Sequence, residues 1–236
     1  MNLILLEKSD FIAGNAVRLT GRRAQHIRTV LKALPGSVCK VGLLDGPTGL
    51  GKVLETAPDS VTMEVALTAP PPPECGVTLV AALPRPQTYR KMLHIAISMG
   101  VKKLVMIQTF KVDKSYWGSS FLAEDFFRRE ALLALEQSLD TVMPEIAFHR
   151  RFKPFLEDVY PALAAGKTAF VAHPDTTDFP PPEPVRPALL IVGPEGGFTD
   201  YEVASFLEAG ARPVTLGRRI FRTEVALPAL LAPWQK

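Results

Sequence analysis

The stretch Leu189-Leu190-Ile191-Val192-Gly193-Pro194-Glu195-Gly196-Gly197-Phe198-Thr199 joins an apolar run to a glycine-rich turn. Thr199 and Glu202 have the Thr-x-x-Glu spacing of a capping box, which predicts a helix starting at this point. A buried strand, a glycine turn and a capped helix in succession indicate a small-molecule site at the C-terminal end of the strand. Gly196 and Gly197 would let the backbone approach a ligand closely, but an ordinary strand-to-helix turn also uses glycines. The turn by itself leaves both interpretations open.

The composition is that of a folded globular protein. Its 236 residues suit one large domain or a small and a medium one, and 47% hydrophobic with 22% charged residues can form a full core. No apolar run approaches the roughly 18 residues of a membrane span, and no basic region precedes an apolar one at the N-terminus. Cys39 and Cys75 have no metal-ligand spacing. We therefore expect a cytoplasmic protein with reduced cysteines, no membrane partner and no metal.

The first third of the chain predicts a β-rich domain. Its short strand candidates are separated by turn residues such as Asp45-Gly46 and Pro58-Asp59, which is typical of a small barrel or sandwich. The candidate strands cover residues 3–6, 17–19, 37–44, 51–56 and 60–68, with a short helix at 22–31. Four consecutive prolines at positions 70–73 form a stiff extended spacer. They predict a boundary between one domain over residues 1–70 and another over residues 74–236.

Beyond the prolines, strand patterns alternate with helix patterns. The alternation predicts an α/β domain in which helices cover both faces of a parallel sheet. The expected strands are residues 77–83, 103–108, 168–172, 188–192 and 212–216, and the expected helices are 88–99, 121–139, 155–165 and 199–209. Pro228 lies in the expected last helix and should kink or shorten it, because proline cannot donate a backbone hydrogen bond.

The densest group of basic residues lies in the N-terminal domain. Residues 18–32 contain five lysines and arginines and one histidine, without any acid. The members of this basic patch are Arg18, Arg22, Arg23, His26, Arg28 and Lys32. Such a cluster is either a solvated helix face or a surface that contacts phosphates, which position a nucleic acid without reading its sequence. The sequence leaves both interpretations open.

Three predicted strands end in loops of unusual content: Ala172-His173-Pro174, the turn at 193–197, and the basic segment at 216–224. Because the C-terminal ends of neighbouring parallel strands form a common crevice, we expect these loops to share one ligand site. The chain lacks the phosphate-loop and dinucleotide glycine patterns, zinc-ligand spacing, and a serine on a sharp strand-to-helix turn. What remains is a neutral, glycine-rich pocket beside a basic loop, which suits a cofactor without a triphosphate next to an anionic substrate.

Two of these motifs together resemble a known family. Val192-Gly193-Pro194-Glu195-Gly196-Gly197-Phe198-Thr199 and Leu216-Gly217-x-Arg219-Ile220-Phe221-Arg222-Thr223-Glu224 look like the paired signature of the RsmE family. These are bacterial 16S rRNA uridine-N3 methyltransferases of the SPOUT class. The resemblance extends over nearly the whole chain. Supporting matches occur at His26-x-x-x-Val30-Leu31, Met99-Gly100-Val101, Glu136-Gln137-Ser138 and Met143-Pro144.

The resemblance implies a PUA-like N-terminal β-barrel that binds RNA and a C-terminal SPOUT methyltransferase domain with a parallel sheet and a trefoil knot. It also implies S-adenosylmethionine (SAM) as cofactor, 16S rRNA of the small ribosomal subunit as substrate, and a homodimer with the site near the subunit interface. The residues expected to hold SAM are Ala172, His173, Val192, Gly193, Pro194, Gly196, Gly197, Leu216, Gly217, Ile220, Phe221 and Thr223. The basic patch and Arg219 are expected to contact RNA.

The implied reaction transfers the methyl group of SAM to N3 of a uridine. Because N3 carries a proton, catalysis needs a cation that stabilises the developing anion or a base that accepts the proton. We hypothesise that Arg222 orients the uracil or stabilises its anion, and that Glu224 or Glu195 orients it or accepts the proton. In the alternative interpretation Arg222 pairs with Glu224 or binds a phosphate, and Thr223 caps the final helix.

The chain departs from the family pattern at several positions. Phe221 replaces a leucine, Val225 replaces a threonine, and residues 95–99 replace a more polar helix sequence. These changes remove polar groups that could contact RNA or cofactor, so they bear on substrate identity more than on fold. Two alternatives stay open: a SPOUT methyltransferase that acts on a different RNA site, and a SAM-binding or RNA-binding protein without catalysis.

Overall fold

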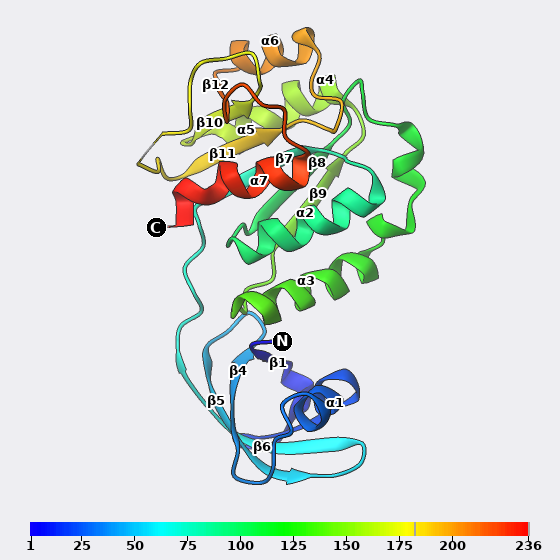
Figure 1. The fold of residues 1–236 in the computed structure, drawn as a ribbon, viewed down its shortest axis with the longest axis vertical. Helices are drawn as coiled ribbons and strands as arrows, with labels where there is room; N and C mark the ends of the chain where they lie inside the picture. The colour runs from blue at the N-terminus through cyan, green and yellow to red at the C-terminus, as the bar shows by residue number, and fades with distance from the viewer. Residues whose placement is uncertain (182, 236) are drawn as a thin grey trace. The chain divides into compact units, whose positions relative to one another are not determined.

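The computed structural model of the protein describes residues 1–181 and 183–235. The chain divides into two compact units, drawn in Figure 1. The first comprises Met1–Pro73 with Leu135–Met143, and the second comprises Glu74–Ala134 with Pro144–Lys236. The first break in the chain falls directly after the four prolines. Residues 135–143 group with the first unit, a return of the chain that the single boundary expected from the sequence does not include.

The first unit is built on a six-stranded mixed sheet with strand order β1-β4-β5-β6-β3-β2. β1 runs parallel to β4, and all other neighbouring strands are antiparallel. Its elements are β1 (Ile4–Leu6), η1 (Lys8–Asp10), β2 (Phe11–Ala13), β3 (Ala16–Thr20), α1 (Gly21–Thr29), β4 (Val38–Leu43), β5 (Thr48–Thr56) and β6 (Ser60–Ala69). Alternate strand residues such as Val17 and Leu19 point into the core, and α1 packs Ala24 and Ile27 against them.

The second unit contains a six-stranded sheet that is parallel throughout, with strand order β12-β10-β11-β7-β8-β9. Its strands are β7 (Val77–Ala82), β8 (Lys103–Ile107), β9 (Glu145–His149), β10 (Thr168–Ala172), β11 (Ala188–Val192) and β12 (Arg212–Val214). Its helices are α2 (Pro86–Ser98), η2 (Lys114–Gly118), η3 (Ser120–Leu122), α3 (Glu124–Ser138), α4 (Phe152–Pro154), η4 (Phe155–Val159), α5 (Tyr160–Ala164), α6 (Asp200–Glu208), α7 (Thr223–Leu231) and η5 (Ala232–Gln235). The last turn of α3 belongs to the first unit.

The central strands β7 and β11 are buried at every residue, as expected for strands covered on both faces. Figure 1 shows α2 and α7 together on one side of the sheet and α6 on the other. Phe206 of α6 is fully buried, and its ring lies 5.4 Å from Phe152, 5.7 Å from Tyr160 and 5.6 Å from Phe198. These edge and tilted ring contacts hold α6 in place. They thereby fix the glycine turn that leads into it.

The predicted fold class, an α/β protein with an N-terminal β domain and a C-terminal parallel-sheet domain, is confirmed. Two strands, β2 and β9, are absent from the sequence prediction. Both lie at sheet edges, and β2 has only three residues, so neither carries a strong alternation of buried and exposed positions. The helix expected at 155–165 starts earlier, at Phe152, and contains a π-helical turn. The trefoil knot and the PUA-like architecture stay predictions.

Candidate functional site

The three loops singled out in the sequence meet at one edge of the parallel sheet. β12, β10 and β11 are neighbours, so the residues that follow Val214, Ala172 and Val192 emerge side by side. A cavity of about 260 Å³ lies between them. All twelve residues expected to hold a cofactor line it: Ala172, His173, Val192, Gly193, Pro194, Gly196, Gly197, Leu216, Gly217, Ile220, Phe221 and Thr223. Glu195 and Arg219 also line this cavity.

The turn at 193–197 needs its glycines for two separate reasons. At Gly193 a Cβ atom would lie 3.3 Å from both the backbone nitrogen and the ring of Phe198, because the chain folds back on itself there. Gly197 has a φ of +70°, and its N–H donates to the carbonyl of Pro194 at 2.8 Å. The turn is therefore tight, closed by a backbone hydrogen bond, and its residues line the cavity.

The predicted capping box at the start of α6 is confirmed. Thr199 Oγ1 accepts a hydrogen bond from the Glu202 N–H, and Glu202 Oε2 accepts one from the Thr199 N–H at 2.8 Å. Glu202 is 2% exposed, and its other oxygen accepts from the Phe110 N–H at 2.7 Å. One buried carboxylate thus joins the helix start to the loop after β8.

Lys111 fastens the same loop to the glycine turn. Its Nζ donates to the carbonyl oxygens of Gly196 at 2.8 Å and Phe198 at 3.3 Å. The ammonium group thus gives two carbonyls of this turn a hydrogen-bond donor. Lys111 belongs to none of the sequence motifs described above. Lys111 follows the expected strand 103–108, which is β8. In the parallel sheet β8 is separated from β11, the strand before the glycine turn, by β7 alone, so a lysine in the loop after β8 could have been expected to reach the turn.

The basic loop between β12 and α7 is largely open to solvent. Arg218, Arg219 and Arg222 are exposed, and Ile220 is 79% exposed although it borders the cavity. Arg222 does not line the cavity; it is the N-cap residue of α7, and no side chain caps that helix. Thr223 is the buried first residue of α7, so the alternative in which it caps the helix is wrong.

Both candidate carboxylates are paired with cations from α2 and its N-cap. Glu195 Oε1 accepts from Arg85 Nε at 3.1 Å, and Glu224 Oε1 lies 3.4 Å from Lys91 Nζ. The ion pair of Glu224 is with Lys91 and not with Arg222, although the charge of Arg222 also lowers the pKa of Glu224. The hydrogen bond from its own backbone N–H, together with Lys91, holds the pKa of Glu224 below its ordinary value. Arg85 and Lys91, like Lys111, are site residues that no sequence motif indicated.

His173 is held by its local backbone. Its N–H donates to the Val214 carbonyl at 2.9 Å, and its Nδ1 accepts from the Asp175 N–H at 3.3 Å. With Nδ1 acting as acceptor, the other ring nitrogen is the one that carries a proton in the neutral form. His173 borders the cavity at the end of β10 and can offer that N–H to a ligand.

The basic patch of the first unit is partly neutralised by acids from elsewhere in the chain. Arg23 forms a bidentate ion pair with Asp10, with Nη1–Oδ2 at 2.6 Å and Nη2–Oδ1 at 2.8 Å. Arg22 Nη2 lies 2.8 Å from Glu136 Oε2, but only its 2.9 Å contact with Oε1 has hydrogen-bond geometry. Burial, the positive N-terminus and Arg22 lower the pKa of His26. Arg18 and Lys32 are exposed, with no ion pair to any residue that the structure describes.

The residues that the structure describes contain neither a candidate metal site nor a helix that could span a membrane. Within residues 1–181 and 183–235, no group of three or more histidine, cysteine, aspartate or glutamate side chains could hold a metal ion. No helix in the same ranges is long and apolar enough to cross a membrane. Cys39 and Cys75 are both free and buried, and burial raises the pKa of each thiol.

Comparison with known proteins adds an independent line of evidence. The profile of the RNA methyltransferase domain family matches residues 71–235. The chain belongs to this family. The match contains the whole of the parallel sheet and the cavity, so the geometry described above is that of an RNA methyltransferase domain.

Individual relatives of this RNA methyltransferase domain protein extend over nearly its full length. It is 28% identical to ribosomal RNA small subunit methyltransferase E of Treponema pallidum, covering 98% of this chain and 90% of the relative. It is 26% identical to the protein of that name from Mycobacterium bovis, covering 92% and 85%. The solved ribosomal RNA small subunit methyltransferase E of Neisseria gonorrhoeae, bound to S-adenosyl methionine, is 20% identical, with a TM-score of 0.75 over 100% of this chain and 97% of that one. The resemblance to the RsmE family is thereby confirmed.

Proposed function

We propose that the protein is a SAM-dependent methyltransferase that modifies N3 of a uridine in 16S rRNA of the small ribosomal subunit. One observation carries the proposal: a single cavity gathers the glycine turn, the end of β10 and the loop before α7, with all twelve residues expected to hold SAM. The names of the relatives from Treponema pallidum and Mycobacterium bovis support the substrate class. The SAM bound to the Neisseria gonorrhoeae relative supports the cofactor.

The cavity suits an adenosine better than a chain of phosphates. Its lining is rich in small or apolar residues, such as Ala172, Val192 and Leu216, and the one lysine beside the turn directs its ammonium to backbone carbonyls. Backbone groups at Gly193, Gly196 and Gly217 would hold the adenosine. Bound there, SAM would supply an electrophilic methyl group on its sulfonium.

The protein must make uracil N3 nucleophilic. Methyl transfer to N3 would leave S-adenosylhomocysteine and methylated uridine, and it requires a protein group that accepts the N3 proton. We assign the cationic role to Arg222, whose exposed guanidinium stands on the loop beside the cavity. A lowered pKa makes Glu224 a weak base, so we assign it to orientation, and assign proton acceptance to Glu195, which lines the cavity.

We further propose that residues 1–70 form a PUA-like RNA-binding domain and residues 74–236 the catalytic domain. The unpaired Arg18 and Lys32 are the strongest phosphate contacts of the basic patch, and Arg22, Arg23, His26 and Arg28 flank them. Arg219 would contact RNA at the cavity. Exposed apolar side chains beside the cavity, Ile220 at 79% and Val225 at 50%, support a homodimer with the site near its interface.

The test measures transfer of labelled methyl from SAM to assembled small subunits and to naked 16S rRNA that lack the modification. The proposal predicts one methylated uridine, mapped by a stop in reverse transcription because a methyl group on N3 blocks base pairing. Methylation at another RNA position would identify a different target, and SAM binding without transfer would identify a non-catalytic binding protein.

Arg222→Ala tests the catalytic assignment. We expect a fall in kcat of about 10²–10³, typical for the loss of one group that stabilises a developing anion, with unchanged SAM affinity by calorimetry. Arg218→Ala is the matched control, because it removes the same charge from the same exposed loop at a residue to which the proposal gives no catalytic role. Full methylation by Arg222→Ala would remove Arg222 from the mechanism.

A further inference from the structure

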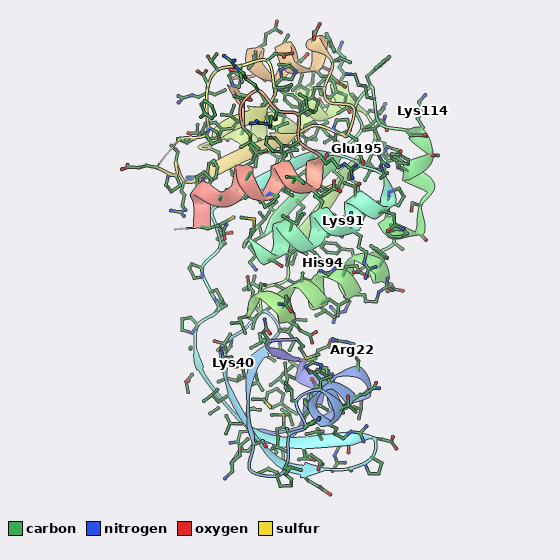
Figure 2. The ribbon with its side chains drawn as sticks, viewed as in Figure 1. Arg22, Lys40, Lys91, His94, Lys114 and Glu195 are labelled. Carbon is green, nitrogen blue, oxygen red and sulfur yellow. The ribbon has the colours of Figure 1, made fainter. Side chains whose placement is uncertain are left out.

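A buried carboxylate on α3 anchors three cationic side chains at the surface of the second unit. The side chain of Glu130 is 2% exposed, and its Oε2 accepts from Arg90 Nε at 2.9 Å and from His94 Nε2 at 2.8 Å. Its Oε1 accepts from both Nε and Nη2 of Arg129 at 3.3 Å. Figure 2 labels His94 between α2 and α3, with Lys91 nearer the N-terminal end of α2. Neither Glu130 nor its partners belong to the cavity.

The cluster has more positive than negative charge. Two arginines face one carboxylate, so at least one positive charge is in excess even when His94 is neutral. The side chains of Arg90 and Arg129 are 52% and 60% exposed, whereas that of Glu130 is 2% exposed. The acid is therefore hidden from an incoming ligand, and the cations are presented to it.

Each guanidinium is held in a fixed orientation with donors left over. Arg90 binds Glu130 through Nε alone, so among the residues that the structure describes its two terminal nitrogens have no partner. Arg129 binds through one edge, and its Cζ lies 5.0 Å from the ring centroid of Phe126. A guanidinium with its free edge turned to solvent is the geometry that takes the two oxygens of a phosphate. Because the side chains are already ordered, binding costs less conformational entropy.

We propose that Arg90 and Arg129, positioned by Glu130, form a binding site for backbone phosphates of the RNA substrate. This inference rests on the proposed function for the identity of the RNA, and it adds a phosphate contact on α2 and α3 to the site at the sheet edge. Lys91, on the same helix and one residue from Arg90, is paired with Glu224. Helix α2 therefore carries both the phosphate contact and the cation that holds a site carboxylate.

The experiment measures the affinity of the full-length protein for naked 16S rRNA and for small subunits as a function of potassium chloride concentration. Arg90→Gln and Arg129→Gln should each weaken binding about tenfold, the loss of one charged hydrogen-bonded contact. Each should also lower the slope of log affinity against log salt by about 0.7–0.9, and the double variant by twice that amount. Lys153→Gln is the matched control, because Lys153 is a 70% exposed cation on α4 paired with Glu157.

Arg90→Lys distinguishes the effect of two-point hydrogen bonding by the guanidinium from the effect of its charge. A lysine keeps the salt slope but cannot bind a phosphate with two parallel bonds, so affinity should fall while the slope stays near that of wild type. Thermal unfolding and SAM affinity report on folding. If Arg90→Gln fails to fold, Arg129→Gln and Arg90→Lys carry the test.

The outcomes distinguish this inference from the proposed function. If the arginine variants bind RNA as Lys153→Gln does while the wild type methylates 16S rRNA, the phosphate site is wrong and the proposed function stands. If wild type binds RNA with the predicted dependence on Arg90 and Arg129 but methylates nothing, the phosphate site stands and the proposed function is wrong. If wild type binds no RNA, both are wrong.

Discussion

Gly197 shows how one residue connects backbone conformation to the proposed cofactor site. Its φ of +70° lies in the left-handed region, where a side chain is unfavourable, and a Cβ there would meet nothing within 4 Å. The cost of a substitution is thus conformational and not steric. Gly210, at the C-terminal end of α6, has a φ of +91° and equally open surroundings, but it lies away from the cavity.

We expect Gly197→Ala and Gly210→Ala each to lower the free energy of unfolding by about 1–2 kcal/mol. Only Gly197→Ala should weaken SAM binding, because it alone disturbs the turn that borders the cavity. Urea denaturation and calorimetry with SAM measure the two effects. Equal SAM affinity for both variants would mean that the turn does not hold the cofactor.

At the scale of elements, hydrogen bonds at the start of α6 join the loop after β8 to the glycine turn after β11. Glu202 closes the capping box with Thr199 and also receives the N–H of Phe110 from the loop after β8. Lys111, the next residue of that loop, binds the carbonyls of the glycine turn. The turn is therefore held by contacts on both sides, and its shape depends on an element that precedes it by about 85 residues in the chain.

Glu202→Ala should lower the free energy of unfolding by about 2–4 kcal/mol, because it removes a helix cap and leaves the buried N–H of Phe110 without an acceptor. We also expect weaker SAM binding, since the turn loses its link to the loop after β8. Glu208→Ala serves as the control: it lies on the same helix, is exposed, and should change stability by less than about 0.5 kcal/mol. The prediction is wrong if the two variants unfold at the same denaturant concentration.

At the scale of the whole molecule, two buried glutamates on α3 respond to pH in opposite directions. Burial acts against ionisation of Glu130, but hydrogen bonds from His94, Arg90 and Arg129 outweigh it and hold the pKa of Glu130 below its ordinary value. Burial raises the pKa of Glu136 in spite of Arg22. Glu130 belongs to the second unit and Glu136 to the first, so each unit contains one of these groups.

The sign of each contribution follows from the shift. Ionised Glu130 stabilises the second unit above the unfolded-state pKa of about 4.3, and this stabilisation is lost as the pH falls through its lower folded-state pKa. Glu136 stabilises the first unit as the pH falls through its raised folded-state pKa, and the gain is complete below about 4.3. Glu130→Gln should thus destabilise the second unit at pH 7, with a difference from wild type that shrinks below about pH 4. Glu136→Gln should cost the first unit less at pH 7 than at pH 4.5.

Hydrogen exchange measured by mass spectrometry assigns these effects to each unit separately, because a chain of two units need not unfold in one step. Exchange rates are first corrected for the intrinsic effect of pH. As the pH falls, the loss of protection caused by Glu130→Gln in the second unit should shrink, and the loss caused by Glu136→Gln in the first unit should grow. The same direction of change in both variants would contradict the opposite shifts of Glu130 and Glu136.

The sequence by itself determined the features that depend on near neighbours along the chain. The capping box joins residues three apart, the glycine turn follows directly on an apolar strand, and in a parallel sheet the loop after each strand leaves the same C-terminal edge. These local patterns predicted the fold class and the three loops that meet at the cavity, and the resemblance to the RsmE family supplied the twelve residues that line it. The edge strands β2 and β9 escaped prediction because half-exposed positions carry little hydrophobic periodicity.

Only the tertiary structure decided which charges meet. Glu195 pairs with Arg85 and Glu224 with Lys91, across 110 and 133 residues of sequence, and Glu136 neutralises Arg22 across 114. A cluster that reads as purely basic in the sequence is thus partly paired in the fold, while Arg90 and Arg129 gain an anchor in Glu130. Ion pairs depend on distances in space, and strand order and helix packing set those distances independently of sequence separation.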